Sequence, residues 1–433
     1  MPRLSSDSRL VREHSGMSRT RHILLFFALL TGVIALAQPA GINSWANHIV
    51  LNGDNWDDII DYLNNQHRHH YKFTIVHIGD SHVQPGIISD EVRRTLQEKF
   101  GNGGRGLISP LALAGTNEPN DYLLKSSSSI SASSRLLSSS KPAGMGMTGV
   151  AVKFSGASTT LSIKAKHQGD DFYRITIFHA PSFPFSVEQN GLEVKGKQRS
   201  NYATDYVLDS SADTASLRLT GSGALYGVRL LNSHRGVVVD CIGNNGATYR
   251  SYLNIDNFAR QISDLEPQLV IISLGTNEAY GSFGNITSNI NQMLNDIRRQ
   301  CPRVKFLLTT PMETQKRSSR GYRIQSDVAT VRDLILAYGK NHNVPVWDFY
   351  RVAGGAGASN RWLKARYMKT DHLHLGNDGY HLQGRLLAEA LLKLLTGEDD
   401  GSDIVEPIKP TAIPEEPATE EESPTEEEEQ KEP

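Results

Sequence analysis

Phe73-Thr-Ile-Val-His-Ile-Gly-Asp-Ser-His82 is the stretch of sequence that decides the fold. Its apolar residues form a short run that Gly79 breaks, which is typical of a buried strand that ends in a sharp turn. Beyond the turn, apolar side chains recur at helical spacing, at Ile88, Val92, Leu96 and Phe100. Strand, turn and helix together place Ser81 at the carboxyl end of a strand, where open α/β sheets bind their ligands. Serines in turns are common, so this stretch alone is a weak signal.

The same alternation of strand and helix returns in the second half of the chain. Strands are predicted over 237–242, 269–274, 304–309 and 344–347, and helices over 253–265, 286–300, 328–341 and 380–395. Strands that alternate with helices of this length predict a parallel sheet with right-handed crossovers. With the strand before Ser81 there are five strands, which suit the flavodoxin-like order of a three-layer α/β domain.

Residues 120–232 have a different texture. After a serine-rich run, short alternating apolar stretches are separated by turns, among them the hairpin-type turn Asn190-Gly191. Many short strands without a helical period predict a β-sandwich, jelly-roll-like in type, of roughly a hundred residues. We expect it to be a domain inserted into the α/β domain, whose two parts are then residues 38–119 and 233–397.

The two ends of the chain differ from its body. Arg19 and Arg21 precede an apolar run that ends in Ala35-Leu36-Ala37, and this pattern predicts a signal peptide over residues 1–37. We therefore expect an exported protein, periplasmic or secreted, with no stable membrane span after cleavage; an uncleaved membrane anchor is the alternative. Residues 398–433 carry a net charge of −13 and few apolar residues, so we expect a disordered acidic tail.

The charge of the remaining chain restricts the partners. Without the tail it carries a net charge of +11, which suits anionic polymers such as cell-wall glycans. No motif for binding nucleic acid is present. The histidine cluster at 67–70 has no cysteine or carboxylate at ligand spacing, so we expect a solvated helix end and no metal. Cys241 and Cys301 are expected at opposite strand ends and therefore unbonded.

Three later segments also place polar residues after strands or near the end of the chain. They are Gly243-Asn-Asn-Gly-Ala-Thr248, Gly275-Thr-Asn-Glu278, and Thr370-Asp-His-Leu-His-Leu-Gly-Asn-Asp-Gly-Tyr380. Each has a structural interpretation by itself, because glycines permit turns and Asn277 could form an Asx turn. The combination of Ser, Gly, Asn and Asp-x-x-His in this order on one α/β scaffold is harder to explain by structure alone.

These segments resemble the four signature blocks of the SGNH/GDSL esterases. Gly79-Asp80-Ser81-His82, Gly246, Gly275-Thr-Asn-Glu278 and Asp371-x-x-His374 match blocks one to four, from Phe73 to about Leu395 apart from the insertion. The histidine after the serine and the β-domain between the first two blocks are similar to bacterial peptidoglycan O-acetylesterases, in which a carbohydrate-binding-like module occupies that place.

The resemblance implies a role for each matched residue. Ser81 would be the nucleophile, His374 its base, and Asp371 the group that orients the imidazole, as serine chemistry requires. The backbone N–H groups of Ser81 and Gly246 and the side-chain amide of Asn277 would form the oxyanion hole. His372 should point elsewhere, and Asp80 should fix the turn by hydrogen bonds. The second block departs from common family forms, so Gly243 is an alternative to Gly246. No metal or cofactor is implied.

The function that follows from the resemblance is removal of O-acetyl groups from a cell-wall glycan, most readily peptidoglycan, through an acetyl-serine intermediate. Two enzymatic alternatives keep the chemistry: an acetyl esterase for plant, host or capsular polysaccharide, and an O-acetyltransferase. A non-catalytic glycan-binding protein is the alternative of a different class, although such a protein has no use for an intact Ser, His and Asp set. Acyl-chain preference and oligomeric state are left open.

Overall fold

The computed structural model describes residues 41–402, apart from 66, 67, 69, 70, 128–131, 138–143, 155–157 and 182–185. The expected signal peptide, nearly all of the acidic tail and most of the histidine cluster at 67–70 lie outside these residues. In the part of the chain that is described, no helix is both long and apolar enough to cross a membrane.

A five-stranded parallel sheet forms the centre of the α/β domain. Its order is β14-β1-β15-β16-β19, with bounds Val237–Gly243, Phe73–Gly79, Leu269–Ser273, Lys305–Thr309 and Val346–Trp347. Numbered along the chain, this is the order 2-1-3-4-5, so the predicted flavodoxin-like arrangement is confirmed. In register, Gly79 at the end of β1 lies opposite Gly243 and Ser273, so the carboxyl ends of three strands meet at one edge.

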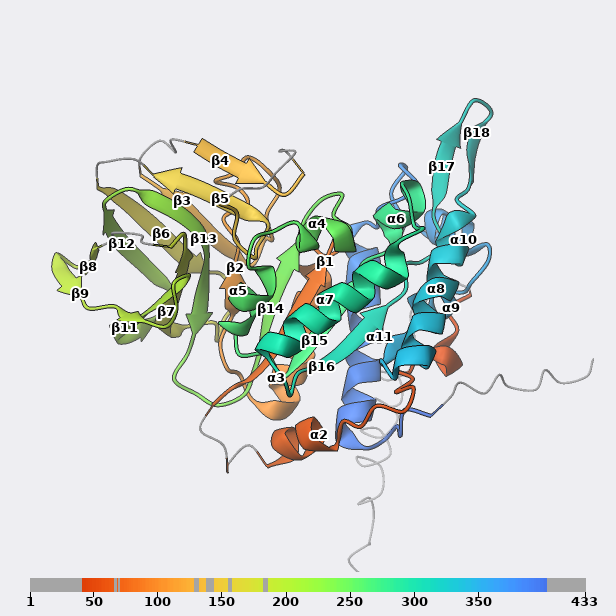
Figure 1. Cartoon of the computed structure of the whole chain (residues 1–433), viewed down its shortest axis with the longest axis horizontal. Coiled ribbons are helices and arrows are strands. Elements are labelled where there is room, and N and C mark those ends of the chain that lie inside the picture. The colour runs from red at the N-terminus through yellow and green to blue at the C-terminus, as the bar shows by residue number, and fades with distance from the viewer. Residues whose placement is uncertain are drawn as a thin grey trace, which may run out of the picture.

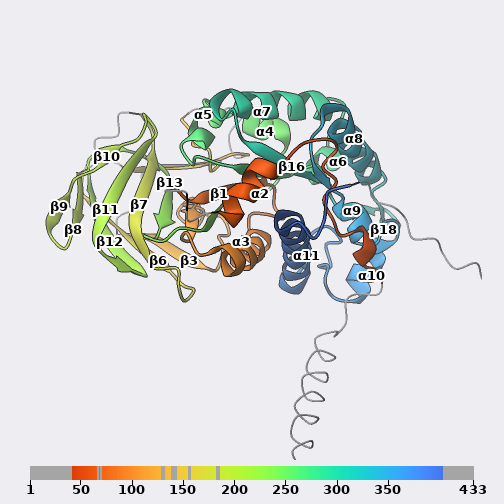
Figure 2. The same cartoon turned by 90° about the horizontal axis from the view of Figure 1, so that it is seen from below.

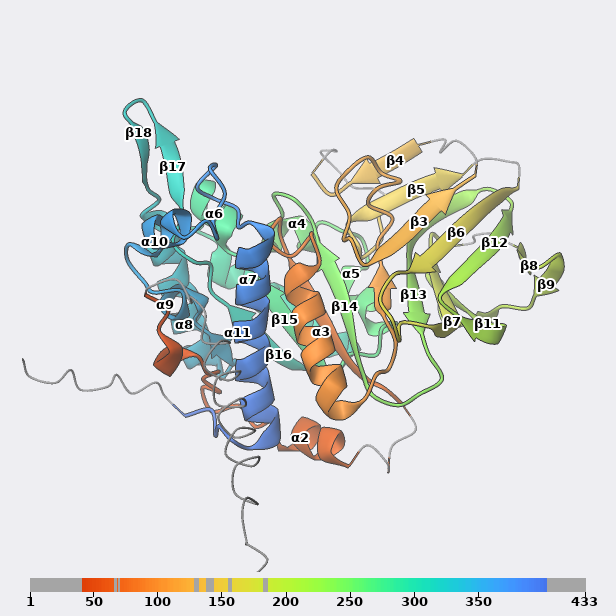
Figure 3. The ribbon, with the colours of Figure 1, turned by 180° about the vertical axis from the view of Figure 1, so that it is seen from behind.

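Helices cover both faces of this sheet and make three layers, seen edge-on in Figure 2. Figure 3 shows one face, covered by α3 (Ile87–Phe100) and α11 (Asn377–Thr396), with α2 (Asp57–Asn64) below them. The opposite face carries α4 (Tyr249–Leu253), α5 (Phe258–Ser263), α7 (Ile286–Gln300) and α8 (Asp327–His342). Successive side chains of a strand face opposite sides. Accordingly, Val76 and Ile78 belong to the core under α7 and α8, whereas Phe73 and Ile75 belong to the core under α3 and α11.

The inserted domain is a β-sandwich at the β14 edge of the α/β domain (Figure 1). One antiparallel sheet contains β2 (Gly106–Ile108), β4 (Ala132–Arg135), β5 (Val150–Phe154), β7 (Phe172–His179), β10 (Lys197–Gln198), β11 (Ala203–Ala212) and β13 (Gly223–Leu231). The other contains β3 (Tyr122–Ser126), β6 (Thr159–Ala165), β8 (Ser186–Gln189), β9 (Leu192–Val194) and β12 (Thr214–Thr220). Apolar side chains of both sheets share one core.

The sandwich begins earlier in the chain than residue 120. Its strand β2 pairs with β13 through Ile108 and Val228, and the backbone N–H of Leu107 donates to Asp240 of β14 at 2.7 Å. A three-residue strand has too few residues to show alternation, so it could not be predicted from its residue pattern. Phe178 and Tyr226 of the sandwich share an apolar core with Phe258 of α5, which joins the insertion firmly to the α/β domain.

Two further features differ from the sequence prediction. The helix expected over 253–265 is shorter than predicted: α5 covers only Phe258–Ser263, and a separate helix, α4, ends at Leu253. Asn257, which precedes α5, adopts a left-handed conformation with φ +58° that a continuous helix does not allow. A hairpin of β17 (Gln315–Ser318) and β18 (Gly321–Ile324) projects from the domain beside α6 (Thr276–Tyr280), as Figure 1 shows. Short helices η1 (Ser44–Ala46), α9 (Phe349–Val352) and α10 (Ala358–Lys364) complete the domain. Both cysteines are free, as predicted.

Candidate active site

Ser81 lies in the turn between β1 and α3, at the carboxyl edge of the parallel sheet. The turn is tight: a Cβ on Gly79 would lie 2.3 Å from Cγ2 of Val83. The buried carboxylate of Asp80 stabilises it, because its Oδ1 accepts a hydrogen bond from the backbone N–H of His82 at 2.9 Å. The predicted role of Asp80 in fixing the turn therefore has a direct structural basis.

The loop before α11 brings two side chains to this serine. Oγ of Ser81 lies 2.9 Å from Nε2 of His374, and Nδ1 of His374 lies 2.8 Å from Oδ2 of Asp371. The three residues are up to 293 positions apart in sequence, and only the fold brings them together. This is the geometry of a hydroxyl nucleophile, an adjacent base and a carboxylate that orients the base.

The carboxylate of Asp371 is held in its charged form. Partial burial acts to raise its pKa, but the backbone N–H groups of Leu373 and His374 and the imidazole of His374 act more strongly together and hold the pKa below its usual value. Both N–H groups donate to Oδ1 at 2.9 Å, which leaves Oδ2 for the imidazole. Asp371 is thus a fixed anion that orients Nδ1 of His374 and stabilises an imidazolium.

Two of the three donors predicted for the oxyanion hole are unpaired within the described part of the chain. Neither the backbone N–H of Ser81 nor that of Gly246 has a hydrogen-bond partner among the described residues. The amide nitrogen of Asn277, on α6, donates to the carbonyl oxygen of Ala247 at 3.0 Å and lies 3.4 Å from Oδ2 of Asp80. The first of these contacts holds the amide beside the loop that carries Gly246.

The two candidate glycines of the second segment differ in their surroundings. A Cβ on Gly243 would lie 2.3 Å from the backbone nitrogen of Gln84, so this glycine allows the Ser81 turn to pack against β14. Gly246 has a φ of +74° and lies beside Leu137 of the sandwich. The surroundings of Gly243 therefore favour a role in packing. Of the two glycines, Gly246 is the better candidate for the oxyanion hole, because its backbone N–H has no partner among the described residues.

Comparisons with known proteins concern the fold and the class of enzyme. The model of the GDSL-like lipase/acylhydrolase family matches residues 209–382, and a solved structure of a peptidoglycan O-acetylesterase shares the fold with a TM-score of 0.67. The chain carries a GDSL-type ester hydrolase domain. The match to the solved structure has 19% sequence identity and covers 78% of this chain and 96% of the other. A search of curated proteins found no match.

Two other solved structures are similar to smaller parts of the chain. A lipase/acylhydrolase from Enterococcus faecalis is 24% identical, with a TM-score of 0.29, and the match covers 36% of this chain and 76% of that one. An acetyl xylan esterase is 16% identical, with a TM-score of 0.29, over 36% of this chain and 82% of the other.

Burial of two carboxyl groups beneath the ester hydrolase site shapes its electrostatics. Burial raises the pKa of Asp80 to about 7; the hydrogen bond from the His82 N–H acts against this rise, and the nearby charge of Glu278 adds to it. Burial also raises the pKa of Glu278, whose Oε1 accepts from the backbone N–H of Tyr249 at 2.8 Å. A protonated Asp80 removes a negative charge from beside Asn277, which favours an oxyanion at that place.

The two other histidines near the site have separate partners. His372 points to the β17–β18 hairpin, where its Nδ1 lies 2.8 Å from Oε1 of Gln315 and its ring stacks on Tyr322 at 3.6 Å. The imidazole of His82 is 5.4 Å from that of His374, and Tyr380 Oη lies 3.3 Å from its Nδ1. Burial lowers the pKa of His82 to about 3, so it is a neutral neighbour of His374.

Sequence reasoning missed two residues that hold the site together. The side chain of Gln84 accepts from the backbone N–H of Asn245 at 2.7 Å and donates to Asn117 at 2.8 Å. It thereby links the Ser81 turn to the loop of Gly246 and to the start of the insertion. Tyr252 on α4 donates to the carbonyl oxygen of Gly79 at 2.6 Å. The position of Gln84, three residues after Ser81, was the only sequence signal for its role, and it did not indicate which residues Gln84 contacts.

A cavity of about 250 Å³ lies between the sandwich and the hydrolase domain, next to the loop of Gly246. The hydrolase domain contributes Gln84, Asn244 and Asn245, and the insertion contributes apolar side chains and Arg135. The insertion therefore supplies one wall of a space that is adjacent to the candidate oxyanion hole.

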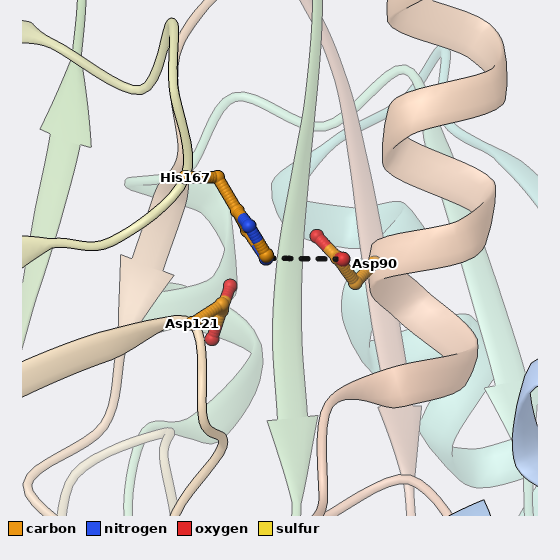
Figure 4. A group of neighbouring side chains, drawn as sticks. All are labelled: Asp90, Asp121 and His167. Carbon is orange, nitrogen blue, oxygen red and sulfur yellow. Dashed lines mark ion pairs between the residues drawn. The ribbon is translucent and has the colours of Figure 1, made fainter.

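One group of possible metal ligands is present among the described residues, away from Ser81. Asp90 of α3 faces Asp121 and His167 of the sandwich, as Figure 4 shows. The acids already have cationic partners, because the buried guanidinium groups of Arg93 and Arg105 contact Asp90 and Asp121 at 2.6 and 2.7 Å. These contacts form an ion-pair network between the two domains.

Proposed function

We propose that this ester hydrolase is an exported serine esterase that removes O-acetyl groups from a cell-wall glycan, with peptidoglycan as its substrate. The observation that carries the proposal is the continuous series of contacts from Oγ of Ser81 through His374 to Asp371. The apolar run at the N-terminus supports export.

In the first half of the reaction, Ser81 takes the acetyl group. Nε2 of His374 accepts the proton of Oγ as Oγ attacks the acetyl carbonyl carbon. The carbonyl oxygen becomes an oxyanion, which the N–H groups of Ser81 and Gly246 and the amide of Asn277 stabilise. Collapse of this intermediate breaks the bond to the sugar oxygen, which leaves with the proton from His374.

In the second half, water removes the acetyl group. His374 accepts a proton from water as the water oxygen attacks acetyl-Ser81, and the same three donors stabilise the second oxyanion. Collapse releases acetate and returns the proton to Oγ of Ser81. No step in this sequence requires a cofactor.

Three observations support a glycan as the carrier of the acetyl group. A cavity of about 250 Å³, one wall of which comes from the sandwich, lies next to Gly246, so a polymer could contact both domains while its ester lies at Ser81. The body of the chain is basic, which suits an anionic cell-wall polymer. The fold shared with a peptidoglycan O-acetylesterase extends over 78% of the chain, which is more than the hydrolase domain alone contains.

The experiment that tests the proposal compares acetate release from O-acetylated peptidoglycan and from acetylated xylan. We expect faster release from peptidoglycan, and no release from either by the Ser81→Ala variant. Faster release from xylan would keep the esterase and exclude the proposed substrate. If the wild-type protein cleaves no acetyl ester, including a chromogenic one, the function is not that of an esterase.

A further inference from the structure

A second cavity, of about 370 Å³, lies at the opposite end of β1 from Ser81. It is open between the amino-terminal edge of the parallel sheet and the outer face of the sandwich. Because β1 has seven residues, its two ends are about 23 Å apart. The cavity is therefore separate from the ester site, although its volume is in the range of small-ligand sites.

The lining of this cavity is strongly basic. Its lining includes five cationic side chains and one carboxylate: Lys72, Arg174, Arg199, Arg229 and Arg235, with Glu266. One carboxylate among so many cations is unusual for a concave surface, because like charges that face each other are costly unless counter-charges are near.

Strand alternation explains how the sandwich contributes to this surface. On β13, Val228 and Leu230 belong to the sandwich core, so Arg229 and Leu231 face outward. Arg174 of β7 pairs with Leu231 and therefore lies on the same outer face. These arginines face Lys72, which immediately precedes β1.

Two of the cations are neutralised by acids of the protein. The guanidinium of Arg229 contacts buried Asp240 at 2.8 Å, and that of Arg199 contacts Asp205 at 2.9 Å and Glu266 at 3.3 Å. These pairs keep both side chains in place but leave little positive charge for a ligand.

Two others have no acidic partner among the described residues. The ammonium of Lys72 donates to Oδ1 of Asn232 at 3.1 Å and to the carbonyl oxygen of His234, which are both neutral acceptors. The exposed side chain of Arg174 has no ion pair or hydrogen bond within the described part of the chain. Burial and, after it, the charges of Arg229 and Arg174 lower the pKa of Lys72 to about 8. A bound anion would oppose both effects.

We propose that this cavity is a second binding site, for an oxyanion such as a phosphate or carboxylate group, in which Lys72 and Arg174 are the ligand-binding cations. The planar guanidinium of Arg174 suits two oxygen atoms of such a group, and Lys72 supplies a point charge beside it. The proposal goes beyond the proposed function and does not depend on it.

The test is a titration of the full chain, by calorimetry, with inorganic phosphate and in parallel with tricarballylate. Chloride at the same ionic strength is the control for screening. We expect saturable binding of one ion per chain, and binding weaker by about tenfold or more in Arg174→Ala, because a hydrogen bond to a charged group is lost. The matched control is Arg218→Ala, on the exposed surface of the same sandwich, which should bind as the wild type does.

Lys72→Met is a second variant that removes the other cation, and melting temperature in the absence of ligand shows whether each variant is folded. Tighter binding of phosphate assigns a phosphate site, and tighter binding of tricarballylate assigns a carboxylate site. Wild-type affinity in a folded Arg174→Ala protein, equal weakening in Arg218→Ala, or the same heat from chloride would overturn the proposal. Hydrolysis of a small acetyl ester should be unchanged in Arg174→Ala, which separates this test from that of the esterase.

Discussion

His374 and His372 are two positions apart in the same loop but have opposite surroundings. His374 contacts Ser81 and Asp371, whereas His372 contacts Gln315 and Tyr322 of the hairpin. We predict that His374→Ala lowers kcat for a chromogenic acetyl ester by about 10⁴-fold or more, because the general base is lost. His372→Ala should lower it by no more than a few-fold. Equal losses in the two variants would contradict the assignment of the base.

Asn277 is the residue whose removal isolates the oxyanion hole. Asn277→Ala should lower kcat by about 10²- to 10³-fold with a small change in KM, because the amide acts on the charge that develops in the transition state. Steady-state kinetics at saturating substrate measure this separation. A variant that loses affinity but keeps the wild-type kcat would show that Asn277 binds substrate instead.

At the scale of elements, the approach of β14 to the Ser81 turn depends on Gly243. A Cβ at this position would lie 2.3 Å from the nitrogen and 2.5 Å from the Cα of Gln84, and backbone cannot rotate away as a side chain can. We predict that Gly243→Ala lowers the free energy of unfolding by about 1–3 kcal/mol and also lowers activity, since the turn must move. Gly284→Ala, where a Cβ would have no neighbour within 4 Å, should change neither in denaturant titrations and ester assays.

His77 couples β1 to its neighbours and to pH. Its ring lies 2.8 Å from Ser89 of α3 and 2.8 Å from Ser273 of β15, and burial lowers its pKa to about 3. The unfolded chain therefore binds a proton between about pH 6.5 and pH 3 that the folded chain does not, so stability is complete above this range and falls as pH falls through it.

We predict from this that His77→Gln flattens the acid side of the stability profile. Between pH 7 and pH 5 the variant should lose about 2 kcal/mol less unfolding free energy than the wild type, although its stability at pH 7 is lower. Urea titrations at both pH values measure the difference. An unchanged slope would mean that His77 does not remain neutral in the folded protein.

Most elements were predictable because their signals are local. The apolar runs of β1, β14 and β15 and the helical spacing of α7 predicted a parallel sheet and the order in which its strands and helices follow each other in the chain. The pairing of β2 with β13 was not predictable, since three residues have no periodicity. The β17–β18 hairpin was missed because its residues are exposed or polar, so it lacks an apolar face.

The candidate site shows the same limit. Ser81, Asp371 and His374 were predicted together because the resemblance to a family supplied their spacing, and the structure brings them within hydrogen-bond distance. The role of Gln84 depends on contacts with residues 33 and 161 positions away. No periodicity or spacing in the sequence could identify those partners.

At the scale of the whole molecule, buried ion pairs join the sandwich to the hydrolase domain. The guanidinium of Arg93, on the helix that follows Ser81, contacts Asp170 of the sandwich at 2.6 Å and Asp90 of its own helix at 2.6 Å. We predict that Arg93→Ala lowers the free energy of unfolding by about 3 kcal/mol or more, because it leaves the buried carboxylate of Asp170 without its partner. Arg94→Ala, which removes the exposed neighbouring arginine, should be close to neutral in the same thermal and denaturant unfolding.

The central claim is that Ser81 carries the acetyl group during turnover. The most direct measurement is mass spectrometry of the enzyme quenched during hydrolysis of an acetyl ester, with the modified peptide identified. We predict an added acetyl group on the peptide that contains Ser81, and neither adduct nor turnover in a folded Ser81→Ala variant. Turnover by that variant at the wild-type rate, or an acetyl group on another residue, would contradict the account.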